Sequence, residues 1–76
     1  MLYFFDLYER DGVTLDEEGV RCGSLADAVE QAIDSLRSIA SADVRRGTLR
    51  TDCRIDLRSI DGGVRKVWLS EAVAVD

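Results

Sequence analysis

Histidine and proline are absent from the sequence, and its 76 residues include only two cysteines. The absence of histidine removes the commonest general base of catalysis and the favoured ligand of zinc, copper and iron. Cys22 and Cys53 stand on either side of the longest predicted helix, without the close spacing of a metal site, so we expect free thiols rather than a disulfide. These absences predict a protein that is not an enzyme and has no catalytic residues, metal or cofactor.

Long apolar runs are absent too, as are low-complexity and linker-like segments. No stretch approaches the roughly 20 apolar residues that a membrane-spanning helix needs. The apolar residues 1–5 are followed by Asp6 and carry no basic leader, so we expect no signal peptide. The length fits a single domain, residues 1–76, which we expect to be cytoplasmic and without a membrane partner.

Positive charge is scarce in the first half of the chain. The net charge is −5, but residues 1–44 hold ten acidic side chains against three arginines, whereas residues 45–76 hold seven basic against five acidic ones. An acidic chain is a poor general binder of nucleic acid. The mildly basic C-terminal part keeps an RNA or DNA partner open as an alternative.

The one long periodic stretch predicts a helix from Ser24 to Gly47. Apolar side chains recur there every three or four residues, which is the helical repeat. The stripe consists of Leu25, Val29, Ala32, Ile33, Leu36, Ile39 and Ala40, with Ala28 at its margin. Ser24 is placed to cap the first turn, and Asp27 to meet the positive end of the helix dipole. Gly47 can take the left-handed conformation that ends a helix.

Aromatic and alternating stretches on both sides of this helix predict strands. The predicted strands span residues 2–8, residues 13–22 with an interruption at 16–19, residues 52–58 and residues 64–70. Asp11-Gly12 and Asp61-Gly62 mark turns between consecutive strands. Residues 71–76 are expected either to extend the last strand or to form one helical turn.

This order of elements predicts an α+β fold of the type ββαββ. Reversal at each turn, with the helix crossing back over the sheet, gives a four-stranded antiparallel sheet of order 2-1-3-4 with the helix on one face. The side chains expected beneath the helix are Tyr3, Phe5, Leu7, Cys53, Ile55, Leu57, Val67 and Leu69.

The opposite face of the sheet is then left without a helix. The side chains expected on it are Phe4, Tyr8, Arg54, Arg58, Val64, Lys66 and Trp68. Aromatic residues and arginine are enriched in protein interfaces, and so short a chain buries little surface alone. We interpret the protein as a small interaction module, most simply a homodimer joined through this face or a strand edge. An unidentified protein partner and a merely solvated face stay open as alternatives.

The rival hypothesis is a regulator that binds nucleic acid. Its basic side chains would be Arg54, Arg58, Arg65 and Lys66, with Trp68 and Phe4 as stacking rings. Single-strand binders combine such a basic groove with aromatic platforms. Asp52 and Asp56 interleave with the arginines, which favours the interaction module over this rival.

Asp16, Glu17 and Glu18 form the densest acidic cluster of the chain. Carboxylate oxygens are the ligands that Mg²⁺ and Ca²⁺ prefer. Three consecutive residues of a turn rarely converge on one ion, however, and their spacing fits no calcium loop. We therefore expect a solvated loop and no metal site.

Several short segments share their order with a known family. They are Tyr3-Phe4-Phe5, Asp11-Gly12, Asp16-Glu17-Glu18-Gly19-Val20, the alanine-rich helix opened by Leu25, and Asp61-Gly62-Gly63. Over nearly the whole chain this resembles an uncharacterised bacterial family of short proteins classed as a domain of unknown function. Many members carry a histidine directly after the Phe-Phe pair, where this chain has Asp6, and the resemblance implies a fold but no activity.

Residues 15–36 also resemble the HicB-like antitoxin fold. There a small sheet leads through a glycine-rich loop into a helix that opens with a Leu-x-x-Ala pattern, here Leu25-Ala26-Asp27-Ala28. This resemblance implies an antitoxin-like regulator and therefore belongs with the rival hypothesis.

Overall fold

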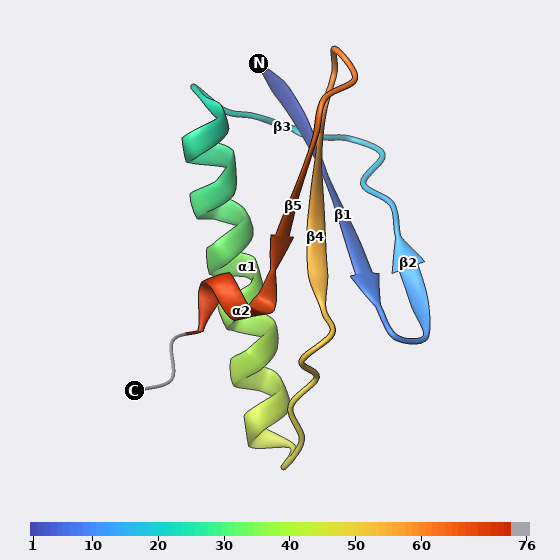
Figure 1. Cartoon of the computed structure of the whole chain (residues 1–76), viewed down its shortest axis with the longest axis vertical. Coiled ribbons are helices and arrows are strands. Elements are labelled where there is room, and N and C mark those ends of the chain that lie inside the picture. The colour runs from blue at the N-terminus through green and yellow to red at the C-terminus, as the bar shows by residue number, and fades with distance from the viewer. Residues whose placement is uncertain (74–76) are drawn as a thin grey trace.

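One long helix, α1, lies against one face of an antiparallel sheet in the computed structural model, which describes residues 1–73 (Figure 1). In chain order the elements are β1 Leu2–Glu9, β2 Gly12–Thr14, β3 Val20–Arg21, α1 Leu25–Arg45, β4 Arg54–Ser59, β5 Val64–Trp68 and α2 Leu69–Ala72. The predicted α+β class, with one long helix packed on the sheet, is confirmed. The short helix α2 follows β5 directly and contacts α1.

Both ends of α1 are closed by the residues that the sequence predicts. At the start, the Ser24 hydroxyl accepts a hydrogen bond from the backbone N–H of Asp27 at 3.2 Å. At the other end Gly47 adopts a φ of +82°, and the N–H of Thr48 donates to the carbonyl of Asp43 at 3.0 Å. This is the Schellman pattern, in which a left-handed residue turns the chain away from the helix axis.

The sheet has five antiparallel strands rather than the four predicted. Along the path β2-β1-β4-β5 its order matches the predicted 2-1-3-4, and β3 adds a pairing with β1. The predicted second strand is divided at its predicted interruption into two separate strands: β2 pairs with the end of β1 at Glu9↔Gly12, and β3 with its start at Leu2↔Arg21. Since β4 occupies the other edge of β1, β2 and β3 share one edge.

The side chain of Asp16 explains the gap between β2 and β3. Its carboxylate accepts hydrogen bonds from the backbone N–H groups of Phe5, Glu18 and Gly19, each at 3.1 Å. The N–H of Phe5 is the group that a continuous second strand would have bonded, and a buried backbone donor needs a partner. The carboxylate takes the place of that strand partner, so the chain can loop outward.

The core lies between α1 and the sheet face that the sequence predicts for it. The predicted side chains in it are Tyr3, Ile55, Leu57 and Val67 from the sheet, Cys53 just before β4 and Leu69 at the start of α2, with Phe5 and Leu7 packed against them. The most deeply buried helix side chains are Ala28, Ala32 and Leu36, each 0% exposed. Two details of the predicted stripe are wrong: Ala28 is central rather than marginal, and Leu25 is 45% exposed. Leu25 borders a surface hollow at the start of the helix instead of packing under it.

The last strand ends earlier than predicted. The alternation predicts a strand through residue 70, but β5 ends at Trp68 and Leu69 begins α2. The carboxylate of Glu71 accepts a hydrogen bond from the backbone N–H of Trp68 at 2.8 Å, which starts the helical turn as an N-terminal cap does. Residues 74–76 of the predicted tail lie outside the described residues. Neither α1 nor α2, the helices of the described part of the chain, is long and apolar enough to cross a membrane.

A candidate interface on the helix-free sheet face

The strand registers arrange the side chains opposite α1 in rows. We call this surface the open face; its residues are Leu2, Phe4, Asp6, Tyr8, Val13, Arg21, Arg54, Asp56, Arg58, Val64, Lys66 and Trp68. Across the strands, the rows are Val13–Tyr8–Arg54–Trp68, Asp6–Asp56–Lys66 and Phe4–Arg58–Val64. The seven residues that the sequence places on this face all lie on it.

Each aromatic ring of the open face has an arginine against it. The guanidinium carbon of Arg54 lies 4.1 Å from the centre of the Tyr8 ring and 5.2 Å from that of Trp68. The guanidinium carbon of Arg58 lies 4.4 Å from the centre of the Phe4 ring. These are cation–π distances, so the rows form a packed layer rather than a set of separate side chains.

Two aspartates neutralise these arginines. Asp6 and Asp56 are 4% and 8% exposed, although no helix of residues 1–73 covers them. Arg58 donates to Asp6 at 3.1 Å, and Arg54 donates to Asp56 at 2.9 Å. Buried charges need such partners. Asp6 and Asp56 alternate with the aromatic and arginine positions of their strands, and that alternation is the sequence signal that places them on the open face, although it does not identify their partners.

The side chains that project from the open face are mainly apolar. Val64, Val13 and Trp68 are 59%, 51% and 41% exposed, respectively. Phe4 and Tyr8 are only half-buried, and Lys66 is exposed. The paired arginines and aspartates therefore form the lower layer of the open face, and large apolar side chains project above them into solvent.

The free edge of β5 is partly closed by its own side chains. Glu71 binds the N–H of Trp68, while Arg65 donates to Glu71 at 2.9 Å and to the backbone carbonyl of Lys66. The hydrogen bond from Arg65 is the main reason why the pKa of Glu71 lies below its ordinary value. Backbone groups at this end of the edge are already bonded, which protects the edge against an added strand.

The carboxylate of Asp16 has a structural role, because it bonds the backbone of its own loop and of β1. The hydrogen bond from the N–H of Gly19 is the largest of the contacts that lower the pKa of Asp16. The neighbouring Glu17 and Glu18 are exposed to solvent. Among residues 1–73, no three His, Cys, Asp or Glu side chains are grouped so that they could hold a metal ion.

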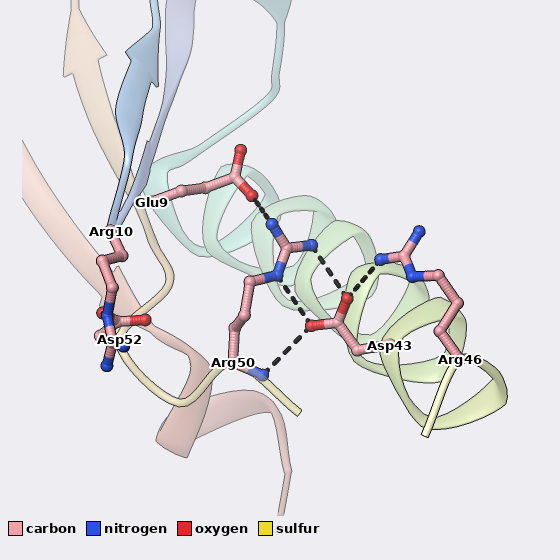
Figure 2. Close-up of polar contacts among 6 residues, drawn as sticks. All are labelled: Glu9, Arg10, Asp43, Arg46, Arg50 and Asp52. Atoms are coloured by element: carbon pink, nitrogen blue, oxygen red, sulfur yellow. Dashed lines mark hydrogen bonds and ion pairs between the residues drawn. The ribbon is translucent and has the colours of Figure 1, made fainter. Parts of the chain in front are cut away.

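A second polar cluster joins the end of α1 to the segment that leads into β4 (Figure 2). The Asp43 side chain is only 1% exposed. It accepts hydrogen bonds from Arg50 at 2.9 and 3.0 Å and from Arg46 at 2.6 Å, and Arg50 also donates to Glu9 of β1. The hydrogen bonds from Arg50 hold the pKa of Asp43 far below its usual range.

We call Glu9, Asp43, Arg46 and Arg50 the Asp43 network. The Asp43 carboxylate also accepts the backbone N–H of Arg50 at 3.2 Å, so its acceptor sites are filled. The Asp43 carboxylate therefore positions the chain and has no free acceptor site. The sequence prediction missed it, although Asp43 stands seven residues after Leu36 and thus on the apolar stripe of the helix.

Comparison with known proteins gives a family but no activity. The family model described as "Domain of unknown function (DUF6894)" matches residues 2–65, which include the long helix and most of the sheet. No curated protein and no solved structure matches the chain. The match agrees with the resemblance to an uncharacterised family, while the resemblance to HicB-like antitoxins stays a prediction.

Proposed function

Because this chain belongs to the family described as a domain of unknown function, DUF6894, we propose a function from its own geometry. The protein is a small, non-enzymatic interaction module that forms a homodimer through the open face.

The observation that supports the proposal is the set of exposed apolar side chains on the open face, which stand above a layer of paired arginines and aspartates. Trp68, Val64 and Val13 all project from the open face. Covering apolar surface gains about 25 cal/mol per Å². Tryptophan, tyrosine and arginine together are the composition of energetic hot spots in protein interfaces.

The open face is preferred to a strand edge as the contact surface. The contacts of Arg65 and Glu71 occupy backbone groups along the C-terminal half of β5. On the other side of the sheet, the edge of β1 is already covered by β2 and β3. The outer edge on that side belongs to β2 and β3, which are only three and two residues long. Both sheet edges therefore offer a second copy little backbone to pair with, whereas the open face offers exposed apolar side chains.

The same contacts weigh against nucleic acid as the partner. A single-strand binder needs free ring faces for bases and free cations for phosphates. Here Arg54 and Arg58 already lie over aromatic rings and are bonded to aspartates. Lys66 and Arg21 are the exposed cations that remain on the open face. They lie on strands at opposite edges of the sheet, so they form no continuous basic groove for a polyanion.

The size of the face sets the expected affinity. The strands β1, β4 and β5 have eight, six and five residues, and β2 and β3 together add five along one edge. At about 4.8 Å between strands and about 3.3 Å per residue, they cover roughly 400 Å² of planar area. With the relief of the side chains, two copies would bury on the order of 1,000 Å² in total, the lower bound of specific interfaces. We therefore expect a reversible dimer with a dissociation constant in the micromolar range.

The cytoplasm is the compartment that we propose for this dimer. Cys22 and Cys53 are both free and buried, as predicted for unbridged thiols. Burial is the main cause that raises the pKa of the Cys53 thiol, which keeps it protonated and unreactive. Free, buried thiols fit a reducing compartment.

The first test is sedimentation equilibrium from low micromolar to submillimolar concentration. We expect the mass to rise from the 8.4 kDa of one chain to twice that value. Trp68 is the only tryptophan, so its emission reports on the open face directly. The emission should shift to shorter wavelength over the same concentration range, because dimerisation removes water from the ring.

Two matched variants assign the effect to the open face. Val64→Lys places a charge in the proposed interface, whereas Val44→Lys places the same charge on α1; the two valines are 59% and 63% exposed. Val64→Lys should weaken the dimer at least tenfold and Val44→Lys should leave it unchanged, with both variants folded by circular dichroism. A protein that stays monomeric at the highest concentration, or equal weakening by both variants, contradicts the proposal.

A further inference from the structure

We infer that the two copies stack about a two-fold axis that runs parallel to the strands, between β1 and β4, so that each arginine of β4 meets an aromatic ring of the partner's β1. This inference rests on the homodimer proposed above and specifies its geometry. It also identifies which side chains of the open face act as a pair across the interface.

The registers of β1 and β4 make the open face complementary to itself. Along β1 the face carries Phe4, Asp6 and Tyr8, and at the same heights β4 carries Arg58, Asp56 and Arg54. A two-fold axis along the strands keeps these heights and exchanges the two strands. Tyr8 then meets the partner's Arg54, and Phe4 meets the partner's Arg58.

The same two-fold axis also brings the outer strands of one copy onto those of the other. The axis exchanges β2 with β5, and Val13 and Trp68 stand at the two ends of one row. The indole of Trp68 is therefore placed over the partner's Val13, which is 51% exposed in the single chain. Two antiparallel sheets packed face to face with their strands roughly aligned form the common β-sandwich arrangement.

The alternative orientation places like charges together. A two-fold axis across the strands would put β4 on the partner's β4 with the heights reversed, so that Arg54 met the partner's Arg58. Like charges in contact at an interface are strongly unfavourable. In the inferred orientation Asp6 does face the partner's Asp56, but each is bonded to an arginine of its own chain, at 3.1 and 2.9 Å.

Directed disulfide formation tests this orientation. Chains that carry Val13→Cys are mixed with chains that carry Trp68→Cys under mild oxidation. We expect a disulfide between one chain of each variant, because facing positions in two packed sheets are close enough to be bridged, as in immunoglobulin-type sandwiches. Each variant alone should stay uncrosslinked, because the two copies of either position would lie at opposite edges, about three strand spacings or 14 Å apart. The unsubstituted protein is the control for Cys22 and Cys53, both of which are buried.

A second measurement avoids the loss of the tryptophan. Arg54→Lys keeps the charge but removes the planar group that stacks on Tyr8 and on the partner's Tyr8. The contact occurs twice in a symmetric dimer, so we expect the dissociation constant to rise at least tenfold. Arg65→Lys, whose side chain is bonded to Glu71 outside the open face, is the matched control and should change it less than about twofold.

The outcomes separate this inference from the homodimer itself. Mixed disulfides together with the specific effect of Arg54→Lys support the orientation. A dimer that crosslinks only within one variant, or that Arg54→Lys leaves intact, overturns the orientation while the homodimer stands. A protein that sediments as a monomer at every concentration overturns both.

Discussion

Asp43 is a carboxylate at a position where the helix pattern calls for an apolar side chain. It follows Leu36 and Ala40 on the buried stripe of α1, and its side chain is as inaccessible as theirs. A buried charge is tolerated only with full hydrogen bonding. Arg46 and Arg50 provide it, and the same bonds fix the segment that leads from α1 into β4 (Figure 2).

We predict that Asp43→Asn lowers the thermal midpoint by about 10 °C or more, because the neutral amide leaves Arg50 without its main acceptor. The folded-state pKa of Asp43 lies below its ordinary value of 3.8, so this stability is present above that value and is lost as the pH falls below it. The difference between the two proteins should therefore be smaller near pH 3 than near pH 7. Circular dichroism melts at both pH values measure it.

Asp34→Asn is the matched control for this prediction. Asp34 also lies on α1 and pairs with Arg37, but its side chain is 77% exposed. Exposed pairs contribute little, so the midpoint should move by less than about 2 °C at either pH. An equal fall of the thermal midpoint in the two variants would contradict the stabilising role that we assign to the buried Asp43 carboxylate.

Individual residues of the open face illustrate what alternation can predict. The period of two placed Phe4, Tyr8 and Trp68 on one face, because strand side chains alternate regardless of their neighbours. It also placed Asp6 there, but nothing in the pattern says that Arg58 would bond it from a strand 52 residues away. Pairing between side chains depends on the register between strands, which periodicity along one strand does not contain.

At the scale of elements, the prediction succeeded where periodicity and turn residues decide, and it missed the single side chains that bond the backbone. The strand order along β2-β1-β4-β5 follows from chain reversal at short turns. The interruption at residues 16–19 was predicted, but the hydrogen bond by which Asp16 replaces the missing strand was not. The early end of β5, which depends on Glu71, was not predicted. Both acids were visible in the sequence, but a single hydrogen bond carries no period.

Two predicted turn glycines differ in whether their backbone conformation requires glycine. Arg10 and Asp11 form the two-residue loop between β1 and β2, while Gly12 already pairs with Glu9. Gly12 is not among the glycines with positive φ, so the predicted Asp-Gly turn lies in the right place without using the freedom of its glycine. Gly47, at +82°, does use it.

We predict that Gly47→Ala destabilises the protein by about 1 kcal/mol, because an alanine at positive φ is strained. A Cβ at Gly47 would meet no atom within 4 Å, so a clash would not contribute. Gly12→Ala is the control, since it too has open space but no positive φ. Urea unfolding should show a change of less than about 0.5 kcal/mol for Gly12→Ala, and equal losses would contradict backbone strain as the cause.

For the molecule as a whole, charge and apolar surface are separated. The net charge of −5 comes from the first half of the chain, whereas the open face holds four basic and two acidic side chains. Two copies that meet through this face bring together nearly neutral surfaces on molecules that repel each other at a distance. Salt should weaken that repulsion, because the Debye length falls to about 8 Å at 0.15 M ionic strength.

We therefore predict that the homodimer becomes tighter by a factor of about two to five as sodium chloride rises from roughly 0.05 to 0.5 M. Screening reduces the repulsion between the two acidic chains and leaves the apolar contact of Trp68 intact. A nucleic-acid complex would behave in the opposite way, because salt competes with each phosphate contact and lowers the affinity. Sedimentation over this salt range, with and without a single-stranded oligonucleotide, distinguishes the two. A dimer that dissociates as salt rises would mean that ion pairs, and not the exposed apolar side chains of the open face, hold the copies together.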